Sequence, residues 1–147
     1  MSAKRKSSRR SVSSKASPPD SAPLFIDRDA WSHKLGQALD GSGIAYVAHR
    51  ERFDHDSADV EWIEMASREN WIAISRDQNI RRKPNELAAI RASRAIIFVF
   101  TSGNLSADAT ARVLLQALPR IRRTATGAKR PGLFSIRLDG SIGRLKL

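Results

Sequence analysis

The sequence contains no cysteine among its 147 residues. This absence excludes disulfides, thiolate zinc sites, iron–sulfur clusters and cysteine nucleophiles, so any metal site must be built from oxygen or imidazole ligands. Long apolar runs are also missing. The longest, residues 95–100, is far shorter than the ~20 residues that a membrane span needs. We therefore expect a cytoplasmic protein without a membrane partner.

Acidic residues are few, 15 against 26 lysines and arginines, which leaves a formal net charge of +11. The excess lies at the two ends of the chain, with +5 on residues 1–22 and +8 on residues 112–147. Residues 23–111 between them carry −2. Basic ends attract a polyanion such as RNA, whereas an acidic centre suits a bound cation.

Large apolar side chains are scarce in residues 1–22, which hold eight serines and six basic residues. Such a segment buries too little apolar surface to offset the entropy lost on ordering, so we expect a disordered basic tail rich in serine and arginine. Residues 23–147 are patterned throughout. Their length suits one domain with one core.

Apolar runs alternate with helical periodicity along residues 23–147. Strands are expected at residues 24–26, 44–47, 71–74, 95–100 and 133–138, and helices at 31–39, 60–66, 85–93 and 113–121. This alternation predicts an α/β fold of three layers, in which helices cover both faces of a mainly parallel sheet. Asp139-Gly140 predicts a hairpin turn after the basic last helix.

Carboxylates follow the first and third expected strands, and ligands bind at the carboxyl ends of strands in parallel sheets. Asp27 and Asp29 come after the first strand, Asp77 after the third, and Asp59 and Glu61 lie near the start of the second helix. Gathered carboxylates raise one another's pKa unless a cation lies among them, and Mg²⁺ or Mn²⁺ prefers such oxygen ligands. We interpret these acids as a metal site.

Helix capping is a simpler interpretation for some of these acids. Asp29 suits the N-cap of the helix at residues 31–39. Asp59, Asp56 or Ser57 suits the N-cap of the next helix, with Glu61 and Glu64 in its first turn. Asp27 and Asp77 follow strands directly and have no capping role of this kind. They are therefore the stronger candidates for function.

Taken together, these segments resemble the PIN-like nucleases, in particular the compact branch related to VapC toxins. The resemblance runs, in order over residues 23–138, through Leu24-Phe25-Ile26-Asp27-Arg28-Asp29, Asp59-Val60-Glu61-Trp62, Trp71-Ile72-Ala73-Ile74-Ser75-Arg76-Asp77 and Thr101-Ser102-Gly103-Asn104-Leu105. It implies a Rossmann-like sheet and a metal-dependent ribonuclease, in which Asp27, Asp59 or Glu61, and Asp77 hold one or two Mg²⁺ or Mn²⁺ ions.

The family's fourth acid has no direct counterpart in this sequence. At its place stands Asn104, with Asp108 one helical turn further on, and these two residues and Asp29 are the second candidates for the site. The resemblance also implies a type II toxin–antitoxin pair, with RNA as substrate and a small antitoxin as protein partner. A homodimer is a further candidate assembly.

Basic residues lie on both sides of Asp77. Arg76, Arg81, Arg82 and Lys83 are candidates for contacts with RNA phosphates near the metal, or simply a solvated charged run. Five later residues suit sequence-independent attraction to nucleic acid, namely Arg120, Arg122, Arg123, Lys129 and Arg130. Polar neighbours predict a surface position for His33, His49 and His55, and the spacing predicts a core position for Trp31, Trp62 and Trp71.

Two other functions stay open from the sequence. A receiver-type phosphoacceptor domain would also have Asp27, Asp29, Asp77 and Thr101 at its strand ends, although no lysine directly follows the last strand as that family requires. A non-catalytic module that binds RNA or a partner on a degenerate nuclease site would need no metal.

Overall fold

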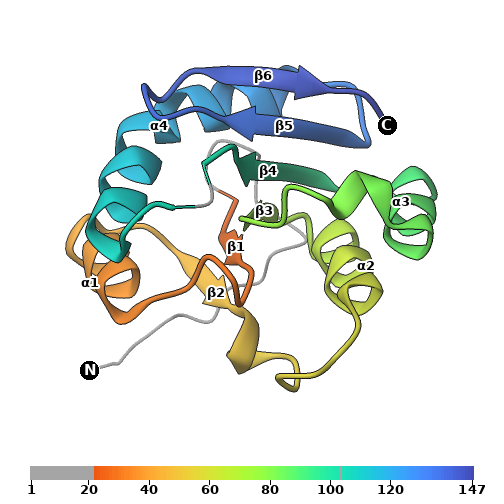
Figure 1. Cartoon of the computed structure of the whole chain (residues 1–147), viewed down its shortest axis with the longest axis horizontal. Coiled ribbons are helices and arrows are strands. Elements are labelled where there is room, and N and C mark those ends of the chain that lie inside the picture. Colours follow the sequence, from red (N-terminus) through yellow and green to blue (C-terminus); the bar gives the residue numbers. More distant parts are fainter. Residues whose placement is uncertain (1–21, 103) are drawn as a thin grey trace.

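The chain folds around a six-stranded sheet that has helices on both faces (Figure 1). The computed structural model describes residues 22–102 and 104–147. The strand order is β2-β1-β3-β4-β5-β6, in which β1 to β5 run parallel and β6 runs antiparallel to β5. The predicted three-layer α/β fold with a mainly parallel sheet is confirmed.

The described elements follow the expected alternation closely. The strands are β1 (Leu24–Ile26), β2 (Tyr46–Ala48), β3 (Ile72–Ser75), β4 (Ile96–Phe100), β5 (Gly132–Ile136) and β6 (Ile142–Leu145). The helices are α1 (His33–Gly41), α2 (Asp59–Glu69), α3 (Pro84–Arg91) and α4 (Ala107–Gly127), with short 3₁₀ turns η2 (His49–Glu51) and η3 (Ile80–Arg82). The predicted disordered tail lies outside the described residues except for Ala22.

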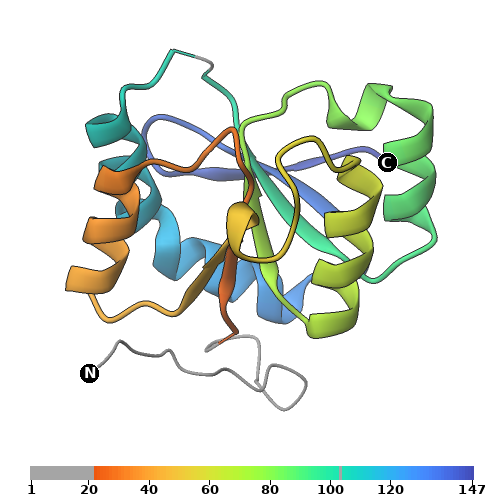
Figure 2. The ribbon, with the colours of Figure 1, turned by 90° about the horizontal axis from the view of Figure 1, so that it is seen from below.

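Each face of the sheet has its own buried layer, as the view in Figure 2 shows with α1 and α4 on one side and α2 and α3 on the other. In β4 all five residues are buried, because successive side chains point to opposite faces of the sheet and helices cover both faces. Phe98 and Phe100 pack with the α1–α4 layer, and Ile97 and Val99 pack with the α2–α3 layer. No described helix is long and apolar enough to cross a membrane.

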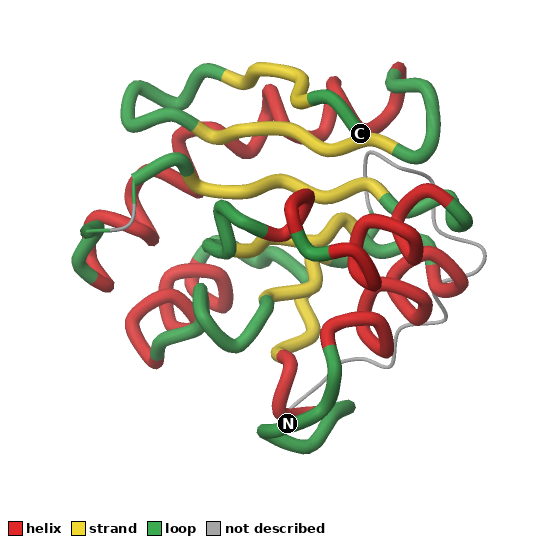
Figure 3. The backbone as a smooth tube through the Cα atoms, turned by 45° about the vertical axis from the view of Figure 1, so that its right-hand side comes forward, coloured by secondary structure: helices red, strands yellow, loops and turns green. Residues whose placement is uncertain are grey.

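The connections after β1 and β3 leave in opposite directions. The chain passes from β1 to α1 on one face, and from β3 through η3 to α3 on the other (Figure 3). Because β1 and β3 are neighbours, their carboxyl ends border a topological switch point, the place where open α/β sheets bind ligands. Asp27 and Asp77 follow these two strands.

Candidate active site

Asp27 lies at the end of β1 with only 3% of its surface exposed. Its backbone N–H donates to Ile74 O on β3 at 2.9 Å, so the sheet itself fixes its position. Its carboxylate accepts two hydrogen bonds, from Arg28 N–H to Oδ1 at 2.8 Å and from the Ser75 hydroxyl to Oδ2 at 3.0 Å. Asp27 is therefore a rigidly held carboxylate at the switch point.

Ser75, the buried last residue of β3, connects three of the acids. Its Oγ donates to Asp27, accepts from Asp77 N–H at 3.0 Å, and lies 3.5 Å from Asp29 Oδ1. A single hydroxyl thus holds together the ends of β1 and β3. Sequence reasoning missed Ser75. In the sequence, only its position at a strand end, two residues before Asp77, indicates that it belongs to the site.

Asp29 belongs to this acidic group, and its expected role as a helix cap is wrong. Ser32 caps α1 instead, because its side chain accepts from Leu35 N–H at 3.0 Å and the helix begins at His33. The Asp29 carboxylate turns toward β3, where its Oδ1 accepts from Arg76 N–H at 3.0 Å.

Asp59 is the first residue of α2, and Ala58 occupies the N-cap without a side-chain hydrogen bond. The capping interpretation of Asp59 is therefore also wrong. Its Oδ1 lies 2.7 Å from Arg28 Nη2 and accepts from Trp62 Nε1–H at 3.1 Å. The Arg28 ion pair turns the Asp59 carboxylate toward the end of β1.

Arg28 fastens the loop before α2 to the end of β1. Besides Asp59, its guanidinium donates to the backbone carbonyls of His55 at 2.9 Å and Ser57 at 3.1 Å, and its Nη1 lies 3.1 Å from His49 Nε2. Because a guanidinium only donates, Nε2 must accept, which requires a neutral His49. Burial, and then the charge of Arg28, lower the pKa of His49 in agreement with this state.

The predicted surface position of His49 is wrong, since only 1% of the residue is exposed. His49 packs against the rings of Phe25 and Phe53, at centroid distances of 6.2 and 5.3 Å. The predicted core positions of Trp62 and Trp71 are confirmed.

Lys83 lies between Asp77 and Asp59. Its Nζ donates to Asp77 Oδ2 at 2.7 Å and lies 4.0 Å from Asp59 Oδ2. The hydrogen bond with Asp77 is the main reason why the pKa of Lys83 is raised. Asp77 also accepts from Asn79 N–H at 3.0 Å, which orders the loop after β3. Lys83, expected to contact RNA phosphate, is therefore also a counter-ion of the acidic group.

The four carboxylates carry more charge than their contacts neutralise. Asp27, Asp29, Asp59 and Asp77 would bear four negative charges. Within the described residues, Arg28 and Lys83 form ion pairs with Asp59 and Asp77, and the charge of Arg76 acts on Asp29. Burial, and then the charge of Asp29, raise the pKa of Asp27 to about 7. Burial also raises the pKa of Asp29. The site therefore favours the uptake of positive charge.

Glu61, Asp108 and Asn104, the other predicted acidic and amide residues of the site, lie apart from this group. Glu61 is exposed on α2, and its carboxylate makes no hydrogen bond or ion pair within the described part of the chain. Asp108 pairs with Lys34 of α1 at 3.0 Å, and Asn104 lies exposed in the loop after β4. Arg82 is exposed and Arg81 half-buried in η3, beside the group.

The chemistry of the donor set fits a hard divalent cation. Among residues 22–102 and 104–147, no three acidic or histidine side chains form a ready-made metal cage. Mg²⁺, however, is usually held by one or two carboxylates together with waters and substrate phosphates. Neither Asp27 nor Asp29 is paired with Arg28 or Lys83, so these two residues offer such a carboxylate pair.

Comparison with known protein families matches residues 23–102 to the family described as PIN like domain. The matched segment covers more than half of the chain, from β1 through β4, and contains all four carboxylates of the group. Comparisons with curated proteins and with solved structures find no match. The family match favours the nuclease-type fold over a receiver-type domain.

Proposed function

The chain belongs to the PIN-like domain family, and on that premise we propose that it is a metal-dependent endoribonuclease acting on RNA phosphodiester bonds. The observation that carries the proposal is the convergence of Asp27, Asp29, Asp59 and Asp77 at the carboxyl ends of β1 and β3. Their surplus negative charge at a topological switch point suits a cation, and that cation can in turn bind a phosphate.

Asp27 and Asp29 would hold Mg²⁺ or Mn²⁺. Such an ion lowers the pKa of water and offsets the charge that develops on a reacting phosphate. Asp59 and Asp77 already bind Arg28 and Lys83, so they would join the ligand set only by exchanging these contacts. Ser75 keeps the Asp27 carboxylate in place, because its hydroxyl donates to Oδ2.

The cationic side chains of the site would position the substrate. Lys83 has three N–H donors, of which one binds Asp77, and its side chain is 44% exposed. A second donor is therefore free to bind a phosphate oxygen of the RNA. Arg81 and Arg82 in the adjacent turn would bind flanking phosphates.

RNA cleavage by Asp27→Asn and Asp77→Asn variants tests the proposal. Asp27→Asn should lose at least about 100-fold in cleavage rate with Mg²⁺ or Mn²⁺, because a metal ligand is removed. Asp77→Asn should lose about as much, because Lys83 then loses the hydrogen bond that positions it for the phosphate. Asp108→Asn is the matched control, since this exposed carboxylate pairs with Lys34 away from the group and should leave the rate unchanged. Full activity of both site variants would overturn the proposal.

We also propose that this nuclease is the toxin of a type II toxin–antitoxin pair, acting on RNA in the cytoplasm. Toxicity would come from the acidic group, so expression in bacterial cells should arrest growth and Asp27→Asn should relieve the arrest. Co-expression of a short open reading frame adjacent to its gene should restore growth if it encodes the antitoxin. Light scattering of the purified chain would test the predicted homodimer.

A second candidate is a non-catalytic RNA-binding module. The observation that favours it is the pairing of Asp59 and Asp77 with Arg28 and Lys83, which fills part of the acidic group with the protein's own cations. This function predicts RNA binding that EDTA does not change and no cleavage at any concentration of Mg²⁺ or Mn²⁺. Cleavage that depends on Asp27 would exclude it.

A further inference from the structure

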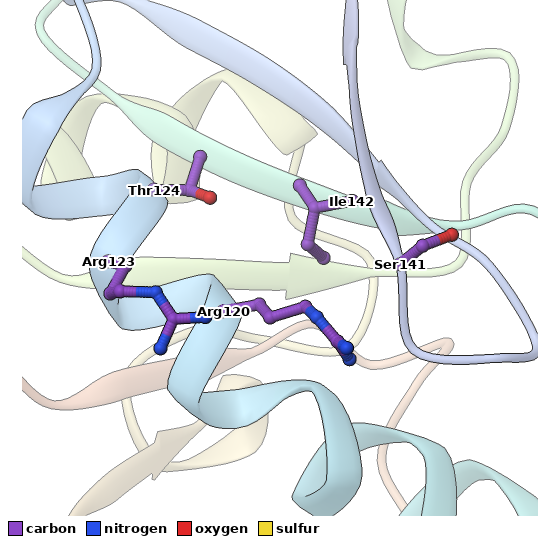
Figure 4. A pocket seen from close by; sticks show the side chains of 5 residues that line it. All are labelled: Arg120, Arg123, Thr124, Ser141 and Ile142. Carbon is purple, nitrogen blue, oxygen red and sulfur yellow. The ribbon is translucent and has the colours of Figure 1, made fainter.

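A polar cavity of about 310 Å³ lies between α4 and the start of β6. Its lining is Arg120, Arg123 and Thr124 from α4, with Ser141 and Ile142 from the hairpin (Figure 4). No carboxylate lines it. Two guanidinium groups and two hydroxyl groups thus line this space, and guanidinium donors suit an anionic group.

The two arginines are available to a ligand. Both are exposed, and Arg123 forms no ion pair within residues 22–102 and 104–147. Arg120 Nη1 makes one long hydrogen bond, 3.5 Å to Gly140 O, which directs it across the cavity toward the hairpin. Because guanidinium groups form paired hydrogen bonds with phosphate oxygens, the lining suits a phosphate.

The hairpin carries one acid, Asp139, and its carboxylate is engaged locally. Asp139 Oδ1 accepts from Ser141 N–H at 2.9 Å, within the turn itself. Arg137 Nη1 donates to Ser141 Oγ at 3.3 Å, so a third guanidinium lies beside the rim. The Ser141 hydroxyl donates to the Asp139 carboxylate, and this hydrogen bond lowers the pKa of Asp139. The surroundings of the cavity are therefore net positive.

The cavity borders the same edge of the sheet as the acidic group. Ile142 pairs with Ile136 at the carboxyl end of β5, and Ile136 pairs with Phe100 at the carboxyl end of β4. Four strand spacings separate β1 from β6, roughly 19 Å at about 4.8 Å for each. An extended RNA strand lying along this edge can therefore reach both places.

Two other basic residues of this region are engaged in structural contacts. Arg122 Nη1 donates to Ala22 O at 3.0 Å, and Arg130 Nη1 donates to Arg94 O at 2.9 Å. Of the five residues that the sequence suggested for attraction to nucleic acid, only Arg120 and Arg123 line the cavity. Arg120 and Arg123 therefore form a defined site, whereas Arg122 and Arg130 serve the fold.

We propose that the cavity formed by Arg120, Arg123, Thr124 and Ser141 binds a backbone phosphate of single-stranded RNA several nucleotides away from the acidic group. This inference rests on the proposed function in taking RNA as the ligand, but it does not depend on cleavage. The site gives affinity without base recognition, because its donors reach phosphate oxygens.

The test compares two double variants of the full chain that lose the same charge. Arg120→Ala/Arg123→Ala removes the cavity lining, and Arg68→Ala/Arg91→Ala removes two exposed arginines on α2 and α3. Fluorescence anisotropy with a labelled 20-nucleotide RNA of mixed sequence, in EDTA and at several salt concentrations, measures the affinity. The cavity variant should bind at least about tenfold more weakly, with a salt slope smaller by about 0.7 to 1.4.

The control variant should lose no more than about twofold to threefold, and equal losses in both variants or unchanged affinity in the cavity variant would overturn the inference. Arg123→Ala alone repeats the test without disturbing the turn.

Asp27→Asn should retain RNA affinity. If the parent chain cleaves no RNA but the cavity variant still binds RNA more weakly, only the proposed nuclease activity is contradicted. Asp27-dependent cleavage with normal binding by the cavity variant would contradict only the phosphate site.

Discussion

The Arg28 guanidinium and the Asp59 carboxylate meet at 2.7 Å and join the end of β1 to the first turn of α2. This ion pair is half shielded from water, with side-chain exposures of 31% and 13%. The same guanidinium also holds two loop carbonyls, so one side chain determines how the loop over residues 49–58 approaches the acidic group.

Replacement of Arg28 by alanine should destabilise the fold. The change leaves the Asp59 carboxylate and two carbonyls without their donor, which costs about 2–4 kcal/mol in the free energy of unfolding. Urea denaturation measures this loss. Arg68→Ala, at an exposed position of α2, should change the stability by no more than about 0.5 kcal/mol. Equal stability of the two variants would contradict the structural role of Arg28.

The stability of the metal-free protein should fall as pH rises from about 4 to about 7. The pKa of Asp27 is about 7 in the fold against 3.8 as the reference value, so in this window the folded state binds more protons than the unfolded state. Asp27→Asn should therefore be more stable than the parent at pH 8, by roughly 2–4 kcal/mol, and similar to it at pH 4.

Urea denaturation in EDTA at pH 4, 6 and 8 measures this difference. Asp56→Asn, which changes an exposed carboxylate, should follow the parent at every pH. A pH profile of Asp27→Asn that is identical to that of the parent would show that Asp27 titrates normally.

Divalent cations should stabilise the folded chain. An ion present at 100 times its dissociation constant adds about 2.7 kcal/mol to the free energy of unfolding. Thermal denaturation with and without Mg²⁺ or Mn²⁺ measures this effect, which should be larger at pH 8 than at pH 6 because the ligands must lose their protons. Asp27→Asn/Asp29→Asn should abolish the stabilisation and Asp108→Asn should keep it. Equal stabilisation of all three proteins would place the ion elsewhere.

Lys83→Met separates the role of Lys83 in stability from its role with substrate. Because the lysine side chain is 44% exposed, loss of its ion pair should cost no more than about 1 kcal/mol. Loss of a positive donor beside the reacting phosphate should lower RNA cleavage by about 100-fold. Urea denaturation and a single-turnover cleavage assay measure the two effects. Cleavage at the parental rate would remove Lys83 from the proposed mechanism.

The fold could be predicted from the sequence because local patterns and tertiary structure agree in it. The apolar run at residues 95–100 becomes β4, buried on both faces, and the strand ends place Asp27 and Asp77 at one edge of the sheet. The alternation of strands and helices predicts parallel strands, and the structure then shows that β1 and β3 are neighbours.

The internal contacts of the site could not be predicted in the same way. Asp29 and Ser32 both suit a helix N-cap, and only the observed start of α1 decides between them. His49 has polar neighbours in sequence, yet the turn after β2 buries it against Phe25 and beside Arg28. The contact of Lys83 with Asp77 depends on the path of η3, which sequence spacing does not specify.

The antiparallel direction of β6 has a practical consequence for attaching the protein to a surface or to a second protein. Because β1 begins and β6 ends at the amino edge of the sheet, Ala22 and Leu147 both lie on the side remote from Asp27. A linker joined at either end of the domain therefore leaves the opposite edge facing the solution. Immobilised or fused forms of the chain should present that edge to RNA without obstruction.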